Sequence, residues 1–508
     1  MSSAKNRLTD RLLNRRALLG YGAAAGFAAT ALNSPGALAN LVQETDNTNR
    51  TIQPDEWTPE YIREIAGTIE VDTAAEVSQI VPLDHAGKVT FWNVGPNEAS
   101  PAIEKEMYDA FWAAFAETYP NIEVDILNLD YNGMIDKLRT ASLGNAAPSV
   151  ARMTILWVPE FTARGYLEPI DLAEFGYTPD LFWKGALQSV TWEGQTYGIP
   201  TNNETMALIW NAGIFEEAGL PPDAPPATWD DLVQYSNQIK QNTGKNGYGM
   251  VARVNAGNTP YRAMPAIWAY GGGALDEAEP EPTYQNVLIN NDGTRAALQT
   301  HLDMYVRDKS VPASALTNTQ TENADPFIAG NLGMVISHPS EYAKLLDMAA
   351  AATGDDKAIA DQVVENIRYG LIPEGPTRRA VVFGGWSIHK FRDEFVDGDN
   401  DPGAAKALMA FVTSAEWSTK LFWAGSNPGN LRGFQTQWMK ERLEQIKFLD
   451  VTTSMLPYGI SYPVVPEAAE MMNIVVPDML QNVLTETMSI EDATDDAAAK
   501  IEELISGL

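Results

Sequence analysis

The sequence contains no cysteine among its 508 residues. This excludes disulfides, thiolate-bound metals and cysteine nucleophiles, and it excludes the lipid-modified cysteine that tethers some exported proteins to a membrane. Histidine is nearly as scarce, since only four are present and they are scattered without metal-ligand spacing. These four are His85, His301, His338 and His389. We therefore expect no metal and no cofactor.

Catalytic motifs are missing as well. The sequence has no Gly-x-Ser-x-Gly nucleophile elbow and no glycine-rich phosphate loop. Pairs of acidic residues are plentiful, but no more so than expected from the 67 Asp and Glu of the sequence, so they do not indicate a glycosidase. The sequence thus favours a protein without catalytic residues, and a secreted carbohydrate-active enzyme is the alternative class.

Basic residues are few compared with acidic ones. The 35 Lys and Arg against 67 Asp and Glu give a formal net charge of −32. A field of this sign repels phosphate backbones and anionic lipid, so we expect neither a nucleic-acid partner nor binding to a membrane surface. We expect a soluble monomer.

Near its start the sequence has an apolar run that is too short to span a bilayer, which needs roughly 20 apolar residues. This run, Ala17–Leu32, follows the pair Arg15 and Arg16 and precedes Ala37-Leu38-Ala39. The layout predicts a signal peptide over residues 1–39, removed on export to the periplasm. The paired arginines favour the twin-arginine route for folded proteins, and the general secretory route is the alternative.

The remaining length is ample for two globular units, because single cores rarely exceed about 250–300 residues. Residues 40–87 are polar and irregular, and we expect an N-terminal extension that is either a loose arm or a strap over one lobe. The acidic segment at 397–401 resembles part of a calcium loop. Its glycine is misplaced and Leu408 stands where a bidentate Glu is needed, so a solvated acidic loop is the preferred interpretation.

From Lys88 onward, strand-like and helix-like patterns alternate. Val89–Val94 and Ile122–Leu129 read as strands, and Ala102–Thr118 between them has helical periodicity. This order predicts a parallel βαβ unit within an α/β fold. Such sheets place ligand loops at the carboxyl ends of their strands, so the loop Asn93–Glu98 is a candidate wall of a site.

An ordered series of motifs carries a family resemblance. It comprises FWNVG at 91, WVPEFTARGYLEPID at 157, GQTYGIPTNNETMALIWNAGIFEEAGL at 194, PPATWDDL at 225, YGGGALD at 270, AGNLGMVI at 329 and FGGWSIHK at 383. In this order and spacing the chain resembles the family 1 extracellular solute-binding proteins, the group that includes maltose-binding protein. Where that protein has a stacking Trp, this chain has His338-Pro339-Ser340, which argues against a maltose-like ligand.

The resemblance implies an α/β clamshell of two lobes, each a mixed sheet flanked by helices. Residues 88–203 and 382–450 would form lobe 1, and residues 204–381 and 451–508 would form lobe 2. The chain would cross between them near 200–204, 381–386 and 440–455. The implied function is capture of a sugar, oligosaccharide or polyol and its delivery to the permease subunits of an ABC importer.

A sugar pocket needs carboxylates, amides and a few cations for the hydroxyls, and flat aromatic rings for the apolar face of the sugar ring. The resemblance assigns ligand contacts to Glu204 and Tyr261 by their spacing from later motifs, and to Trp386 at the return crossing. The further candidates are Trp157, Asn203, Asn93, Thr154, His338, Arg432 and Tyr462. Any of the aromatic candidates has the alternative role of a core residue.

The charge of the ligand stays open. Arg152, Arg262 and Arg432 lie on or beside candidate loops, where they would clamp a phosphate, sulfonate or uronate. The same fold binding an anionic sugar derivative or a glycerol phosphate-type ligand is therefore the second hypothesis.

Overall fold

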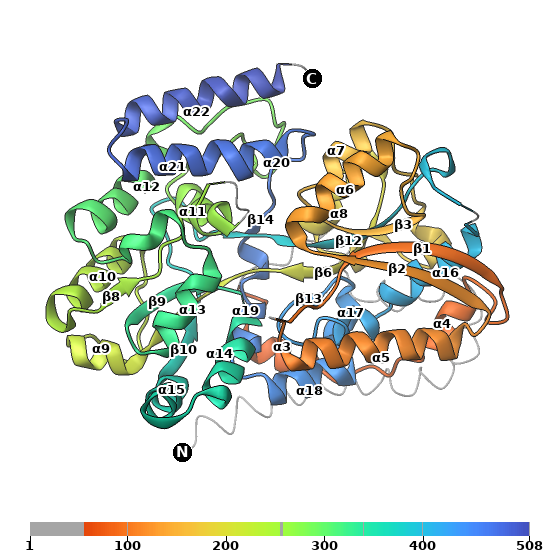
Figure 1. Ribbon diagram of the computed structural model, residues 1–508, viewed down its shortest axis with the longest axis horizontal. Helices are drawn as coiled ribbons and strands as arrows, with labels where there is room; N and C mark the ends of the chain where they lie inside the picture. The colour runs from red at the N-terminus through yellow and green to blue at the C-terminus, as the bar shows by residue number, and fades with distance from the viewer. Residues whose placement is uncertain (1–54, 99, 255–257, 339, 399, 507–508) are drawn as a thin grey trace, which may run out of the picture.

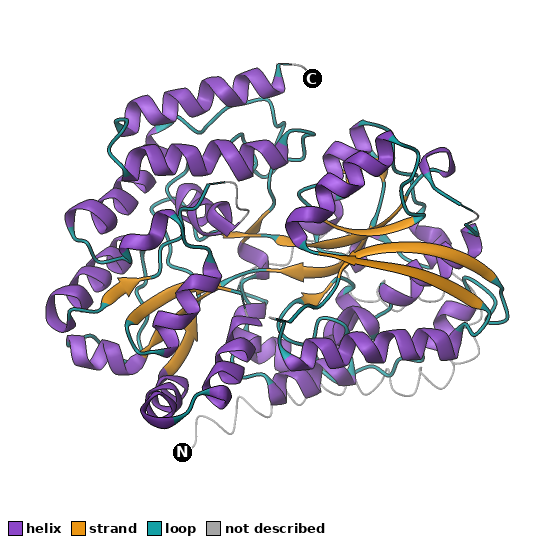
Figure 2. Cartoon of the chain, in the orientation of Figure 1, coloured by secondary structure: helices purple, strands orange, loops and turns teal. Residues whose placement is uncertain are grey.

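The computed structural model describes residues 55–98, 100–254, 258–338, 340–398 and 400–506. Two lobes lie side by side, and strands in the middle of the molecule run from one into the other (Figure 1). Each lobe is a sheet with helices above and below it (Figure 2). The predicted two-lobe α/β fold is confirmed, whereas the predicted signal peptide lies outside the described residues.

The larger lobe is built on a six-stranded mixed sheet with the order β13-β6-β12-β3-β1-β2. β1 runs parallel to β2 and β3, while β12 is antiparallel to both β3 and β6. The predicted βαβ unit is present as β1, α5 (Ala102–Thr118) and β2. The strands are β1 (Gly87–Val94), β2 (Ile122–Leu129), β3 (Val150–Thr154), β6 (Ile199–Glu204), β12 (Gly384–Lys390) and β13 (Asn427–Pro428).

The other lobe holds a four-stranded sheet with the order β10-β7-β9-β8. Every residue of β7 and β9 is buried, as expected for central strands covered on both faces. Thr228 begins α10 with a capping box to Asp231. The elements are β7 (Ala207–Asn211), β8 (Asn246–Tyr248), β9 (Leu332–Ser337), β10 (Ile367–Gly370), α10 (Trp229–Thr243), α11 (Asn258–Ala269), α12 (Asp292–Leu302), α14 (Ser340–Ala351), α21 (Val476–Leu484) and α22 (Ile490–Ile505).

Within the described part of the chain, three segments connect the lobes. The first runs from β6 into β7 through Thr205 and Met206 alone. The second runs from β11 (Val381–Val382) into β12 through Phe383, and the third leaves α19 (Leu449–Thr453) for β14 (Gly459–Ile460). β11 and β14 pair in parallel, so the second and third crossings support each other.

The described part of the predicted N-terminal extension, residues 55–87, is a strap and not a loose arm. Trp57 is only 4% exposed and packs edge-on against Phe434, with ring centroids 5.1 Å apart. Its Nε1 donates to the carbonyl of Thr453, so the strap contacts the third crossing. The helices of the strap are α3 (Pro59–Ile65) and α4 (Thr73–Ser78).

Candidate ligand-binding site

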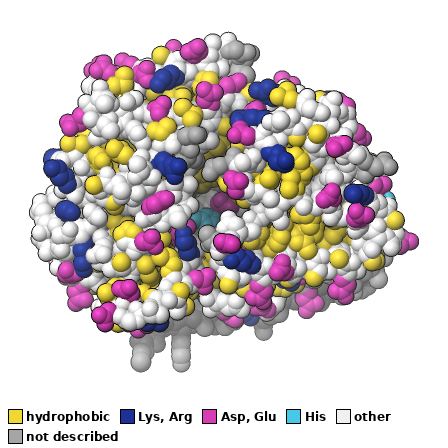
Figure 3. Space-filling model, viewed as in Figure 1, with side chains coloured by type: hydrophobic (Ala, Val, Ile, Leu, Met, Phe, Trp, Pro, Cys, Tyr) yellow, Lys and Arg dark blue, Asp and Glu magenta, His cyan; other side chains and the backbone are white. Residues whose placement is uncertain are grey.

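A cavity of about 500 Å³ lies between the lobes, beside the first two crossings. Figure 3 shows it as a hollow between the two halves of the molecule. Its volume falls in the range of roughly 300–1,000 Å³ that is typical of small-molecule pockets. Five of the ten ligand contacts predicted from sequence line it: Glu204, Tyr261, Trp386, Thr154 and His338. Arg152 and Arg262, which the sequence offered for an anionic ligand, line it as well.

Glu204 ends β6 where the chain leaves the larger sheet. Its Oε1 accepts hydrogen bonds from Asn202 Nδ2 at 3.0 Å and from Ser426 Oγ at 3.2 Å. Among the described residues no hydrogen-bond donor reaches Oε2. The two hydrogen bonds to Oε1 fix the orientation of the carboxylate, and Oε2 can accept a hydrogen bond from a ligand hydroxyl.

Arg152, in the middle of β3, is the cation of the larger lobe's wall and is only 6% exposed. Its guanidinium lies between two rings, 4.7 Å from the centroid of Trp386 and 4.4 Å from that of Phe422. Burial lowers the pKa of Arg152 to about 10, which leaves it charged at neutral pH. Its hydrogen bonds go to neutral oxygens of Asn93, Thr201 and Asn202, and no carboxylate of the described chain pairs with it directly.

The smaller lobe contributes Tyr261 and Arg262 from α11. Arg262 Nε donates to the carbonyl of Ile336, and its Nη1 donates to Asn258, which fixes the guanidinium at the edge of the cavity. Burial raises the pKa of Tyr261 well above its ordinary value, so its hydroxyl stays protonated and can both donate and accept.

His338 presents a buried donor. The backbone N–H of Ser340 donates to His338 Nδ1 at 3.2 Å, so Nδ1 is an acceptor and the proton of the neutral ring is on Nε2. Burial lowers the pKa of His338, which keeps the ring neutral. Nε2 is buried and has no hydrogen-bond partner among the described residues, although His338 lines the cavity. A ligand acceptor would satisfy it.

Two further carboxylates face the cavity from opposite lobes, and sequence reasoning missed both. Glu104 lies in the first turn of α5 and Glu341 in the first turn of α14. Burial raises the pKa of each. Nothing in the local sequence separates them from the many surface glutamates of this acidic chain. Phe422 and Ser426 were also missed, because only the tertiary structure brings their loop to the site.

Four predicted residues lie behind the wall of the cavity and do not line it. Strand alternation turns Asn203 away from the side that Glu204 faces, and its Nδ2 donates to the carbonyl of Pro428. Asn93 is buried against Arg152. Trp157 and Tyr462 are buried with their rings edge-on to Trp386 and Tyr261, at centroid distances of 5.9 and 5.7 Å.

The prediction that Arg432 contacts the ligand is wrong, because Arg432 pairs with a residue of the strap. Arg432 Nη2 forms an ion pair with Glu76 Oε1 at 2.9 Å, and Arg432 is not part of the cavity wall. The acidic segment near 400 also has a structural role, because Asp401 caps α16 (Pro402–Val412) and bonds to His85. Asp399 lies outside the described residues, and no group of three potential metal ligands occurs among the residues that are described.

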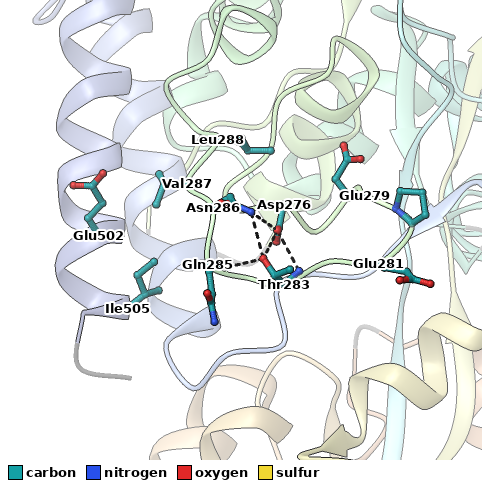
Figure 4. A pocket seen from close by; sticks show the side chains of 11 residues that line it. Asp276, Glu279, Glu281, Thr283, Gln285, Asn286, Val287, Leu288, Glu502 and Ile505 are labelled. Carbon is teal, nitrogen blue, oxygen red and sulfur yellow. Dashed lines mark hydrogen bonds between the residues drawn. The ribbon is translucent and has the colours of Figure 1, made fainter.

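A larger hollow of about 1160 Å³ lies between the loop 276–288 and α22 (Figure 4). The hydrogen bonds drawn in Figure 4 lie within this loop. Asp276 Oδ2 accepts from Thr283 and Asn286, and Thr283 Oγ1 accepts from the backbone N–H of Gln285. Its described lining has no aromatic ring and no cation. The interlobe cavity has both, and it is therefore the better candidate for ligand capture despite its smaller volume.

Comparisons with known proteins agree on one family and one fold. Residues 96–419 match the family described as bacterial extracellular solute-binding protein. A putative binding protein of Brucella abortus (strain 2308) is 24% identical over 412 residues, which cover 77% of this chain and 88% of the relative. The sn-glycerol-3-phosphate-binding periplasmic protein UgpB of Shigella dysenteriae is 37% identical over 240 residues, covering 45% and 48% of the two chains.

Among solved structures, the GacH receptor of Streptomyces glaucescens, determined unliganded and with acarbose, superposes with a TM-score of 0.67. The superposition covers 83% of this chain and 99% of the receptor at 22% identity. This likeness shows the two-lobe fold. Among the described residues, no helix is both long and apolar enough to cross a bilayer.

Proposed function

Because the chain belongs to the bacterial extracellular solute-binding proteins, we propose that it captures a sugar, oligosaccharide or polyol for an ABC importer. The ligand would be held in the interlobe cavity and passed to the transmembrane permease subunits, with ATP hydrolysis left to partner proteins. Members of this family bind solutes and are not enzymes, so the prediction of a solute-binding protein without enzymatic activity is confirmed. We further propose that the protein acts as a monomer in the periplasm and that its precursor is exported by the twin-arginine route.

The observation that carries the proposal is the composition of the cavity wall. Glu204 offers a carboxylate oxygen, and His338 offers an N–H donor without a partner. Tyr261 and Trp386 add aromatic rings, although Arg152 already covers one face of Trp386. A polyol requires this mixture of acceptors, donors and flat apolar surface. The acarbose complex of the GacH receptor supports the same class of ligand.

A second ligand class, an anionic sugar derivative or a glycerol phosphate, is favoured by one specific feature. Arg152 is buried and has no hydrogen bond or ion pair to a carboxylate of the described chain, although the nearby charges of Glu204 and Glu104 act on it, so a ligand anion would be its first direct anionic partner. Arg262 stands on the opposite wall of the cavity. The partial similarity to the glycerol-3-phosphate-binding protein of Shigella supports this alternative.

We propose that the ligand is retained by closure of the lobes. The moving bodies would be residues 88–203 with 382–450 and residues 204–381 with 451–508. Several short crossings permit rotation about one axis and prevent sliding, and a ligand drives closure only if both lobes contact it. Arg152 and Tyr261 would provide these contacts. Small-angle scattering should then show a smaller radius of gyration with ligand, and the Arg152→Gln, Tyr261→Ala double variant should lose that decrease.

The experiment that tests the function is a thermal-shift screen followed by calorimetry. The panel contains acarbose, maltose and other neutral sugars and polyols, together with sn-glycerol 3-phosphate and uronates. A ligand at 100 times its Kd stabilises the folded state by about 2.7 kcal/mol, which such a screen detects. Glu204→Gln should weaken binding of a neutral ligand, and Arg152→Gln should abolish binding of an anion.

Arg432→Gln is the matched control, because Arg432 pairs with Glu76 away from the cavity. A panel that leaves the melting temperature unchanged throughout would reject both ligand classes. Release of reducing ends from the oligosaccharides would instead support the enzyme alternative.

A further inference from the structure

Arg442 does not line the ligand cavity, but it donates hydrogen bonds to the backbone of Phe422 and Ser426, which do. Arg442 lies on α18 (Gln437–Gln445) and is fully buried, with 0% of its surface exposed. No carboxylate of the described chain pairs with it. Its guanidinium instead meets the loop 421–426, which follows α17 (Trp417–Lys420) and leads into β13.

Four hydrogen bonds join this one guanidinium to four backbone carbonyls. Nε donates to Trp423 O and Nη1 to Thr419 O, each at 3.2 Å. Nη2 donates to Phe422 O at 3.1 Å and to Ser426 O at 2.7 Å. Because the five N–H groups of arginine have a rigid planar arrangement, four simultaneous bonds fix the relative positions of these carbonyls.

The same loop provides side chains that contact two of the charged groups of the site, Arg152 and Glu204. Phe422 lies over the guanidinium of Arg152, and Ser426 Oγ donates to Glu204 Oε1. A shift of the loop would therefore move a partner of the site's cation and a partner of its carboxylate together.

We propose that Arg442 is a positioning residue of the ligand site, which sets Phe422 and Ser426 against Arg152 and Glu204 through the loop backbone. This positioning role rests on the proposed function only for its predicted effect on ligand affinity. Its effect on the order of the loop does not depend on which ligand the protein binds. Packing alone does not explain a guanidinium at this place, because an apolar side chain would fill the space without the cost of burying a charge. What the guanidinium adds is the set of four directed bonds.

Replacement of Arg442 tests the role in the full chain. In Arg442→Met the four carbonyls lose their donor, and we expect amide hydrogen exchange across residues 421–428 to become at least tenfold faster. Exchange in β1 and α16, to which Arg442 donates no hydrogen bond, should be unchanged. Arg442→Lys should give an intermediate result, since an ammonium group has three donors and cannot span the loop. Arg432→Met, an arginine with a side-chain ion pair outside the cavity, is the matched control.

Affinity is the second readout, with acarbose and sn-glycerol 3-phosphate as probes. Arg442→Met should weaken whichever probe the wild type binds by tenfold or more, with Arg442→Lys in between and Arg432→Met unchanged. If the wild type binds neither these probes nor any other member of the screening panel, the functional proposal loses its support, while the exchange data still decide the role of Arg442.

Unchanged exchange in the loop would overturn the role. So would faster exchange spread evenly over the lobe, since that pattern indicates general destabilisation. If Arg442→Met does not fold, the comparison of Arg442→Lys with the wild type decides by the same criteria.

Discussion

The hydroxyl of Tyr261 lies against Gly384: a Cβ atom on this glycine would be 2.3 Å from Tyr261 Oη and 3.1 Å from the ring. Gly384 begins β12 directly after the second crossing, and Tyr261 belongs to the helix α11 of the smaller lobe. An aromatic residue of the cavity wall is therefore in direct contact with the end of the second crossing. No side chain larger than hydrogen fits at position 384 without moving the tyrosine.

Gly384→Ala should displace Tyr261 and weaken ligand binding, and the overpacking should cost roughly 1–3 kcal/mol of stability. Removing the hydroxyl in a Gly384→Ala, Tyr261→Phe double variant eliminates the closest contact and should recover part of that stability. Chemical denaturation of the four proteins in this double-mutant cycle measures the coupling. Strictly additive effects would show that the two residues do not interact.

Tyr261→Ala should weaken ligand binding tenfold or more while changing the unfolding temperature little. The reason is that stacking on a sugar face in a closed cavity contributes on the order of 1 kcal/mol or more. Tyr462→Phe is a suitable control, since Tyr462 is buried behind Tyr261 and its hydroxyl has no partner in the described chain. Calorimetric titration that finds equal affinity in Tyr261→Ala and the wild type would make Tyr261 a core aromatic residue only.

Much of the fold was predictable because its signals are local. The capping box of Thr228 and the strand, helix and strand between 89 and 129 are readable from adjacent residues. The ordered motifs then supply the arrangement of the lobes, which periodicity alone does not give.

The site was less predictable because it depends on which way a side chain points and on distant partners. Glu204 and Asn203 are neighbours on one strand, yet only the first faces the cavity. The strand period of two separates them, but it does not say which of the two faces inward. Arg432 was misassigned because its partner, Glu76, lies in the strap, for which the family motifs provide no guide.

His338 should act as a hydrogen-bond donor to the ligand. His338→Leu removes the Nε2–H and should lower affinity by the equivalent of about 0.5–1.5 kcal/mol, or up to roughly tenfold. His338→Gln keeps an N–H donor of similar reach and should retain more of the affinity. Since the pKa of His338 is lowered by burial, wild-type affinity should not change between pH 6.5 and 8 through this residue. Stronger binding at pH 5.5 that depends on His338 would contradict the neutral assignment.

Glu277 should make the stability of the protein depend on pH. It is buried, its Oε1 accepts from Trp268 Nε1 and Ala274 N, and its Oε2 accepts from Leu275 N. Burial outweighs these bonds and raises its pKa from 4.5 to about 7. The folded protein thus keeps a proton that the unfolded chain releases near its ordinary pKa. The stabilisation from this group is complete below about pH 4.5 and is lost as the pH rises to about 7.

Glu277→Gln removes the titration, so its unfolding free energy relative to the wild type should increase from pH 4.5 to 7 and then level off. Urea denaturation at half-unit pH intervals measures this difference. Glu279→Gln, two residues away on an exposed part of the same loop, is the control and should follow the wild-type curve. If the curves of Glu277→Gln and the wild type run parallel over this range, Glu277 is ionised throughout, and its three N–H donors compensate fully for its burial.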